Sequence, residues 1–95
     1  MSVYVLIDLD VHDPAAMADY VTKVLPVITK YGGKVLATDP EPDLYEGSWS
    51  PGLVVILEFE TRLAVRSFYD APEYEPIRAI RIGAATSNGL IAVGA

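Results

Sequence analysis

The sequence contains no cysteine and only one histidine, His12. Disulfide bonds, thiolate nucleophiles and cysteine-bound metals are therefore excluded. A single imidazole leaves too few strong ligands for a zinc or non-haem iron centre. His12 also precedes Asp13 and Pro14, a pair that predicts an exposed turn into a helix. The sequence thus predicts no metal site and no resident cofactor.

Basic residues are scarce as well. The sequence has 7 lysines and arginines and 13 aspartates and glutamates, so the formal net charge is −6. Nucleic acids and anionic membrane surfaces attract proteins of the opposite charge balance, and neither is an expected partner. The apolar start of the chain lacks a basic segment and carries Asp8 and Asp10, unlike a signal peptide or a membrane span. We therefore expect a cytoplasmic protein.

Apolar residues are abundant for so short a chain. The 95 residues make up one domain's length, yet 52% of them are hydrophobic and the mean hydropathy is +0.31. A domain of this size hides only about 60–65% of the surface that its unfolded chain exposes. We expect residues 1–95 to form a single domain whose surplus apolar surface is covered by a second copy.

Four segments are predicted to be β-strands, and the first and third of them have a clear alternating pattern. They span residues 2–10, 33–38, 53–60 and 90–93. In the first and third, one face is apolar throughout, whereas the other carries Tyr4, Asp8 and Glu58 among apolar neighbours. Residues 44–49 either extend the second strand or form an arm, and residues 87–89 are expected to form a turn before the last strand.

The spacing of apolar residues predicts an amphipathic helix that is capped by Asp13 and ends at Lys30. A second helix begins after Thr61 and is broken at Pro72, and a further short helix covers residues 73–85. The resulting β-α-β-β-α-β order is that of the ferredoxin-like α+β fold, an antiparallel sheet with its helices packed on one face.

The other face of this sheet would be too apolar to leave in water and too charged for an ordinary core. A twofold dimer that packs two such faces across a partly polar cleft satisfies both constraints. We therefore expect a homodimer in which Trp49 and the second and fourth strands contribute to the interface.

Several short motifs resemble those of one protein family. They are Tyr31–Ala37, Glu46–Trp49, Val55–Phe59, Phe68–Tyr74 and Ile77–Arg81. Together they resemble the DUF1330 family of the dimeric α/β barrel superfamily. The resemblance implies a ferredoxin-like protomer that dimerises through its sheet, but it implies no established reaction. Superfamily members include cofactor-independent monooxygenases, lactone isomerases, haem enzymes and ligand-binding regulators.

Asp8 and Glu58 lie on the expected cleft face of neighbouring strands. Two close carboxylates in apolar surroundings raise the pKa of one of them, which produces a general acid or base. The alternative is an ion pair with a basic residue. Arg81, between Ile80 and Ile82, is expected to be partly buried and to need a carboxylate or an anionic ligand. We predict Arg81 within salt-bridge reach of Asp8, Glu58 or a bound anion.

Four aromatic residues complete the predicted substrate-binding site with Arg81. They are Tyr4, Trp49, Tyr69 and Tyr74. One hypothesis is a homodimer that binds a small, perhaps anionic, organic molecule and acts as a cofactor-independent isomerase, lyase or oxygenase, with Asp8 or Glu58 as proton acceptor. The alternative is a non-catalytic binding or structural module with an internal ion-pair network. An open cavity with an unpaired carboxylate favours the first, and full neutralisation favours the second.

Overall fold

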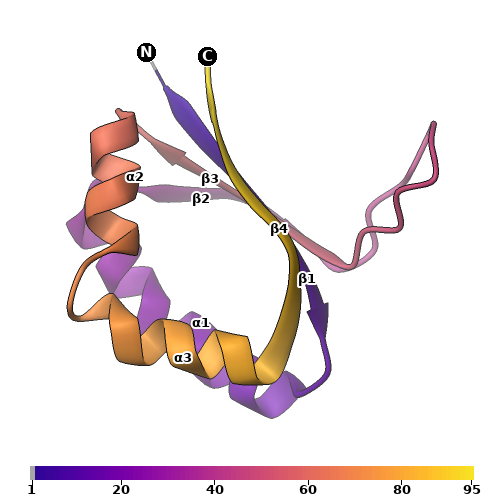
Figure 1. Cartoon of the computed structure of the whole chain (residues 1–95), viewed down its shortest axis with the longest axis horizontal. Helices are drawn as coiled ribbons and strands as arrows, with labels where there is room; N and C mark the ends of the chain where they lie inside the picture. Colours follow the sequence, from indigo (N-terminus) through magenta and orange to yellow (C-terminus); the bar gives the residue numbers. More distant parts are fainter. Residues whose placement is uncertain (1) are drawn as a thin grey trace.

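The computed structural model describes residues 2–95. The elements follow in the order β1 (Val3–Val11), α1 (Pro14–Lys30), β2 (Lys34–Asp39), β3 (Leu53–Phe59), α2 (Arg62–Tyr69), α3 (Tyr74–Ala84) and β4 (Ala85–Gly94) (Figure 1). This is the predicted ferredoxin-like α+β fold, with the short extra helix in its expected place. None of the helices between residues 2 and 95 has the length and apolar character needed to cross a membrane.

The strands form one antiparallel sheet in the order β2-β3-β1-β4. The helices lie together on one side of this sheet (Figure 1). Side chains alternate across a strand, so Ile7 and Leu9 point under the helices whereas Asp8, between them, points to the uncovered side. We refer to this second side as the helix-free face.

The core lies between the sheet and the helices. Leu9 from β1 and Phe59 from β3 are almost fully buried there. They pack with Met17, Val24 and Ile28, which recur along α1 at the spacing of one helix face. The apolar periodicity of the sequence therefore positions both layers of the domain.

The ends of the helices follow the sequence signals. The Asp13 carboxylate accepts a hydrogen bond from the backbone amide of Ala16 at the start of α1. The Thr61 hydroxyl accepts one from the amide of Ala64 at the start of α2. The predicted break at Pro72 is confirmed, because α2 and α3 are separate helices joined at a corner.

The last strand differs from the prediction, because β4 already begins at Ala85 and includes the segment expected to be a turn. Gly89 lies opposite Asp8 and Ser87 lies opposite Leu9, so Asn88 is an extra residue at a shift of register. An Asn-Gly pair suits a β-bulge as well as a turn. The long partner strand β1 supplies the backbone hydrogen bonds that keep this segment extended.

Candidate functional site

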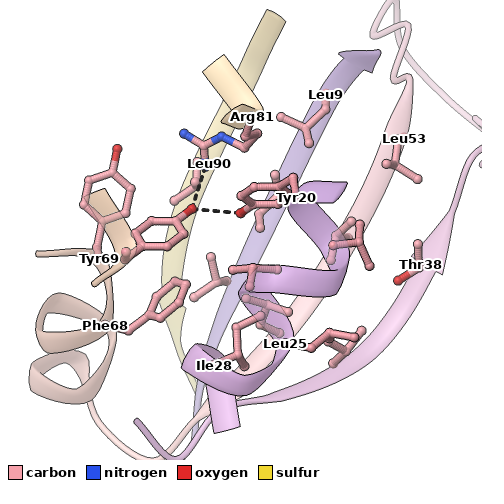
Figure 2. A pocket seen from close by; sticks show the side chains of 18 of the residues that line it. Leu9, Tyr20, Leu25, Ile28, Thr38, Leu53, Phe68, Tyr69, Arg81 and Leu90 are labelled. Carbon is pink, nitrogen blue, oxygen red and sulfur yellow. Dashed lines mark hydrogen bonds between the residues drawn. The ribbon is translucent and has the colours of Figure 1, made fainter. Parts of the chain in front are cut away.

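A cavity of about 290 Å³ lies between the helices and the covered face of the sheet. Most of its wall is apolar, with side chains from β1, β3, β4 and the helices (Figure 2). Polar groups reach it from Thr38 and from four residues that gather on the side of α3, which are Tyr20, Tyr69, Tyr74 and Arg81. No aspartate or glutamate lines it.

Three polar side chains form a hydrogen-bonded chain at one end of the cavity (Figure 2). The hydroxyls of Tyr20 and Tyr74 lie 2.8 Å apart. The Arg81 Nη1 donates to the Tyr74 hydroxyl at 3.2 Å. Arg81 is only 4% exposed, and its buried Nε has no hydrogen-bond partner. This end of the cavity therefore carries a positive charge with unused hydrogen-bonding capacity.

Tyr20 contributes a phenol that stays protonated. Burial is the main reason that its pKa lies well above the ordinary value of 10.0, and the neighbouring Tyr74 raises it further. A protonated hydroxyl can donate a hydrogen bond to a ligand. Tyr20 is not among the site residues predicted from the sequence. The available signal was a hydroxyl on the core-facing stripe of α1, which must find a polar partner once it is buried.

Tyr69 is fixed in the cavity wall by Arg78. The Arg78 guanidinium lies 4.8 Å from the centre of the Tyr69 ring and donates a hydrogen bond of 2.8 Å to the Tyr69 carbonyl oxygen. A cation over an aromatic face is attracted by the electrons of the ring. The corner between α2 and α3 is thus held together beside the cavity.

Asp8 lies on the opposite side of the sheet and is 6% exposed. Its carboxylate accepts a hydrogen bond from Trp49 Nε1 at 2.8 Å and one from the Gly52 amide at 2.9 Å. Burial by itself raises the pKa of Asp8, but hydrogen bonds from Gly52, Trp49 and Asn88 outweigh it, and the net pKa lies below 3.8. Asp8 is therefore a charged hydrogen-bond acceptor.

Through these bonds Asp8 holds residues 40–52, the segment between β2 and β3 that we call the arm. The arm projects from the sheet on the side away from the helices (Figure 1). Tyr45 on the arm is 92% exposed, and Trp49 is 56% exposed. Residues 44–49 therefore belong to a separate arm and do not extend β2, which ends at Asp39.

Glu58 is engaged by other partners on the helix-free face. It accepts a 2.6 Å hydrogen bond from the Ser2 hydroxyl and lies 3.7 Å from Lys34 Nζ. The Ser2 hydrogen bond is the main reason that the pKa of Glu58 lies below its ordinary value. Burial opposes this effect, and the charge of Lys34 lowers the pKa further.

The expectation that Asp8 and Glu58 lie close together is wrong. The two strands are neighbours as predicted, but Glu58 pairs with Tyr4 and Asp8 pairs with Val54. The carboxylates are therefore separated by four residues along the strands, which is about 13 Å at about 3.3 Å per residue. The register between the strands, which the sequence pattern leaves open, decides this separation.

The predicted ion pair of Arg81 with Asp8 or Glu58 is also wrong. Arg81 lines the cavity under the helices, and the sheet separates it from both carboxylates. Within residues 2–95 no ion pair includes Arg81. Burial of Arg81 is confirmed, and the alternative partner, a bound anion, stays a prediction.

The structure thus divides the predicted site residues between two sides of the sheet. Tyr69, Tyr74 and Arg81 line the cavity, and the helix-free face carries Tyr4, Asp8, Trp49 and Glu58. Their roles in binding or catalysis stay predictions. No group of three or more histidine, aspartate or glutamate side chains within residues 2–95 is arranged to hold a metal ion.

Solved structures with this architecture share little sequence with the chain. A protein of unknown function from Rhodopseudomonas palustris, RPA0582, is 22% identical, with a TM-score of 0.77 over 97% of this chain and 80% of that one. SnoaB from Streptomyces nogalater, a cofactor-independent oxygenase, is 14% identical, with a TM-score of 0.71 over 99% and 92%. These likenesses show the fold.

A dimeric ferredoxin-like protein of unknown function from Jannaschia sp. CCS1 is 14% identical, with a TM-score of 0.68 over the full length of both chains. A comparison with curated proteins finds no match. The family model described as a domain of unknown function, DUF1330, matches residues 2–95. This match covers every motif on which the resemblance rests, and the chain belongs to the DUF1330 family.

Proposed function

We propose that the protein binds a small, largely apolar organic molecule in the cavity between the helices and the sheet. The observation that carries this proposal is the cavity itself, about 290 Å³ in volume, with apolar walls and a polar end. Protein interiors rarely leave voids much larger than a water molecule. Ligand sites, in contrast, are cavities from about 300 Å³ upward with a few convergent polar groups.

We propose a different role, self-association, for the helix-free face. Its acidic groups already have partners, since Asp8 holds the arm and Glu58 contacts Ser2 and Lys34. That arrangement fits the alternative of an internal polar network better than it fits an open catalytic cleft. The exposed apolar residues Ile91 and Val93 support packing against a second copy, as does the dimeric state of the Jannaschia protein.

The cavity is tested with a variant that fills it and a neutral probe, 2-naphthamide. Val55→Phe places a larger side chain in the cavity wall. Ile82→Phe adds the same ring at an exposed position of α3, where Ile82 is 61% exposed, and serves as the control. Binding is measured by calorimetry and by chemical shifts of the methyl groups.

We expect the parent and Ile82→Phe to bind 2-naphthamide with shifts at the methyls of Val24 and Leu57, which line the cavity. Val55→Phe is expected to bind at least about tenfold more weakly, a change of about 1.4 kcal/mol. Equal binding by Val55→Phe, or shifts only at Ile91 and Val93, would contradict the proposal. Thermal unfolding of each variant verifies that it is folded.

A second candidate is proton-transfer catalysis without a cofactor, as in an isomerase or lyase. The observation that favours it is the position of the Tyr74 hydroxyl, between the Arg81 guanidinium and the Tyr20 hydroxyl. Such donors stabilise negative charge that develops on a carbonyl oxygen when a neighbouring C–H bond breaks. The oxygenase activity of SnoaB belongs to a protein that shares only the fold, so it supports this reaction class by analogy alone.

The catalytic candidate is tested with 2-tetralone, an easily enolised ketone, in deuterated buffer. A carbon-bound proton leaves to solvent base, its electron pair moves to the carbonyl oxygen, and a deuteron then replaces the proton. We expect the protein to accelerate this exchange and Tyr74→Phe to lose most of the acceleration while it still binds 2-naphthamide. Exchange at the rate of buffer alone would exclude this candidate and leave the binding proposal intact.

A further inference from the structure

Arg81 is a buried cation without a counter-ion. It is 4% exposed, and no ion pair includes it within residues 2–95. A guanidinium group has five N–H donors, and one of them donates to the Tyr74 hydroxyl. Its Nε is buried with no partner. Burial of an uncompensated charge is strongly unfavourable, so this arrangement needs a further explanation.

The surroundings of Arg81 supply no negative charge. The chain has 13 acidic residues, but none lines the cavity, and Asp8 and Glu58 face the other side of the sheet. Tyr20 and Tyr74 supply hydroxyls instead, and burial keeps Tyr20 protonated by raising its pKa. A cation with two phenol hydroxyls beside it offers several donors to one acceptor group.

We infer that the cavity takes an organic acid with one negative charge, whose anionic group is bound by Arg81 and whose apolar body lies against the cavity wall. This inference rests on the proposed function and specifies its ligand. The apolar lining and the volume of about 290 Å³ suit a body of one or two rings. Arg81 is the one cationic residue in the lining, so a ligand with two charges would leave one unpaired.

A hollow lined in part by basic residues adjoins the cavity. This hollow, of about 600 Å³ between α2 and β4, shares Val65, Tyr69 and Leu90 with the cavity wall, and Arg62 and Arg66 also line it. The side chain of Arg66 is 72% exposed and lies 3.6 Å from the Asp70 carboxylate, which offsets part of its charge. In a protein of net charge −6, these arginines give an anion a locally favourable approach.

A second hollow, of about 570 Å³, adjoins the cavity on another side, where it shares Leu9, Met17 and Leu53. Its charged lining residue is Asp10, which repels an anion. The charged side chains that line the two hollows therefore differ in sign, and the hollow with the positive side chains lies beside Tyr69. This difference is a separate observation from the burial of Arg81, and both indicate an anionic ligand.

The test compares 2-naphthoate with 2-naphthamide, two probes of nearly equal shape that differ by one negative charge. Calorimetry measures their dissociation constants at neutral pH for the parent, for Arg81→Met and for Lys23→Met. Methionine keeps the length of the Arg81 side chain without its charge. Lys23→Met removes one positive charge from an exposed position on α1, and so controls for the change in net charge.

We expect the parent and Lys23→Met to bind 2-naphthoate at least about tenfold more tightly than 2-naphthamide, since hydrogen bonds to charged groups are the stronger ones. In Arg81→Met this preference is expected to disappear while 2-naphthamide still binds. Without ligand, Arg81→Met is expected to unfold at a urea concentration no lower than the parent, because removal of an unpaired buried charge relieves its cost.

Equal binding of the two probes by the parent would overturn the inference that the ligand is an anion, but the proposal that the cavity binds a small molecule would stand. A preference for 2-naphthoate that persists in Arg81→Met would also overturn it, since another residue would then bind the charge. If the parent binds neither probe, the proposed function itself fails. The comparison of the two probes on the parent decides the inference even where a variant does not fold.

Discussion

Asp8 is a nearly buried carboxylate that is kept charged by hydrogen bonds rather than by a cation. No ion pair includes it within residues 2–95. Its pKa in the folded chain lies below 3.8, because the donors Gly52, Trp49 and Asn88 outweigh the effect of burial. A lowered pKa means that Asp8 stabilises the fold at pH values above 3.8. This stabilisation is lost as the pH falls through the folded-state pKa.

Trp49 makes this loss measurable, because it is the only tryptophan in the chain and its indole donates to Asp8. We expect its fluorescence to stay constant from pH 7 down to about pH 4 and to change below that, as the protonated Asp8 releases the arm. Asp8→Asn is expected to show altered emission already at pH 7 and to lack the acid transition.

Glu58→Gln is the control, since this carboxylate shares the helix-free face but contacts Ser2 and Lys34 instead of Trp49. The variant is expected to keep the parent emission at neutral pH. An unchanged acid transition in Asp8→Asn would show that another group controls the arm. Far-ultraviolet circular dichroism separates release of the arm from unfolding of the whole chain.

At the residue scale, the sequence predicted helix caps and burial better than it predicted which side chains contact one another. The caps Asp13 and Thr61 follow from local rules and were correct. Burial of Arg81 was correct too, because its neighbours in sequence are apolar. Its partner was wrong, since the choice between the two sides of a sheet is made by the packing of α3. The distance from Asp8 to Glu58 depends on register in the same way.

At the scale of the elements, the position of the arm depends on the residue at its base, Gly52. Gly52 ends the arm directly before β3, and its amide binds Asp8. A Cβ atom at this position would overlap the Leu9 carbonyl oxygen and would lie 2.7 Å from Asp10 Oδ1. The carbonyl belongs to the paired backbone of β1, so it has little freedom to move away.

We therefore expect Gly52→Ala to lower the free energy of unfolding by about 1–3 kcal/mol, the usual range for overpacking, and to shift the Trp49 emission. Gly89→Ala is the matched control, because a Cβ there would meet nothing within 4 Å. Urea unfolding of the three proteins measures the difference. If both variants unfold like the parent, the base of the arm has more room than the structure shows.

The elements in which apolar residues recur at a regular spacing were predicted from the sequence. They are β1, β3 and the three helices. The start of β4 was not, because Asn88-Gly89 has the composition of a turn. Local composition competed there with pairing to a nine-residue partner strand, β1. Strand pairing is a non-local effect, so no window of sequence around Asn88 contains it.

At the scale of the whole molecule, the sheet separates the two groups of residues that the sequence analysis placed in a single cleft. The alternating pattern predicted one apolar face and one mixed face, and both exist. The pattern does not reveal that the apolar face leaves a void of about 290 Å³, because a void depends on how the shapes of side chains fit. The ligand site proposed here therefore lies under the helices, and the proposed self-association uses the mixed face.

Self-association through the helix-free face is the prediction for the whole molecule. Ile91 on β4 is 56% exposed there, on the side of β1 that carries Leu6. Light scattering at micromolar concentration is expected to give about twice the chain mass of 10.3 kDa. Ile91→Glu is expected to weaken the dimer by about a hundredfold or more, since an unpaired charge would be desolvated at the interface.

Leu63→Glu places the same charge on α2, where Leu63 is 73% exposed on the helix side, and should leave the dimer intact. A parent mass of one chain would reject self-association. Dissociation by Leu63→Glu instead of Ile91→Glu would move the interface to the helices. In that case the apolar residues of the helix-free face would have to be explained without a second copy, since an apolar patch of this kind rarely stays in water.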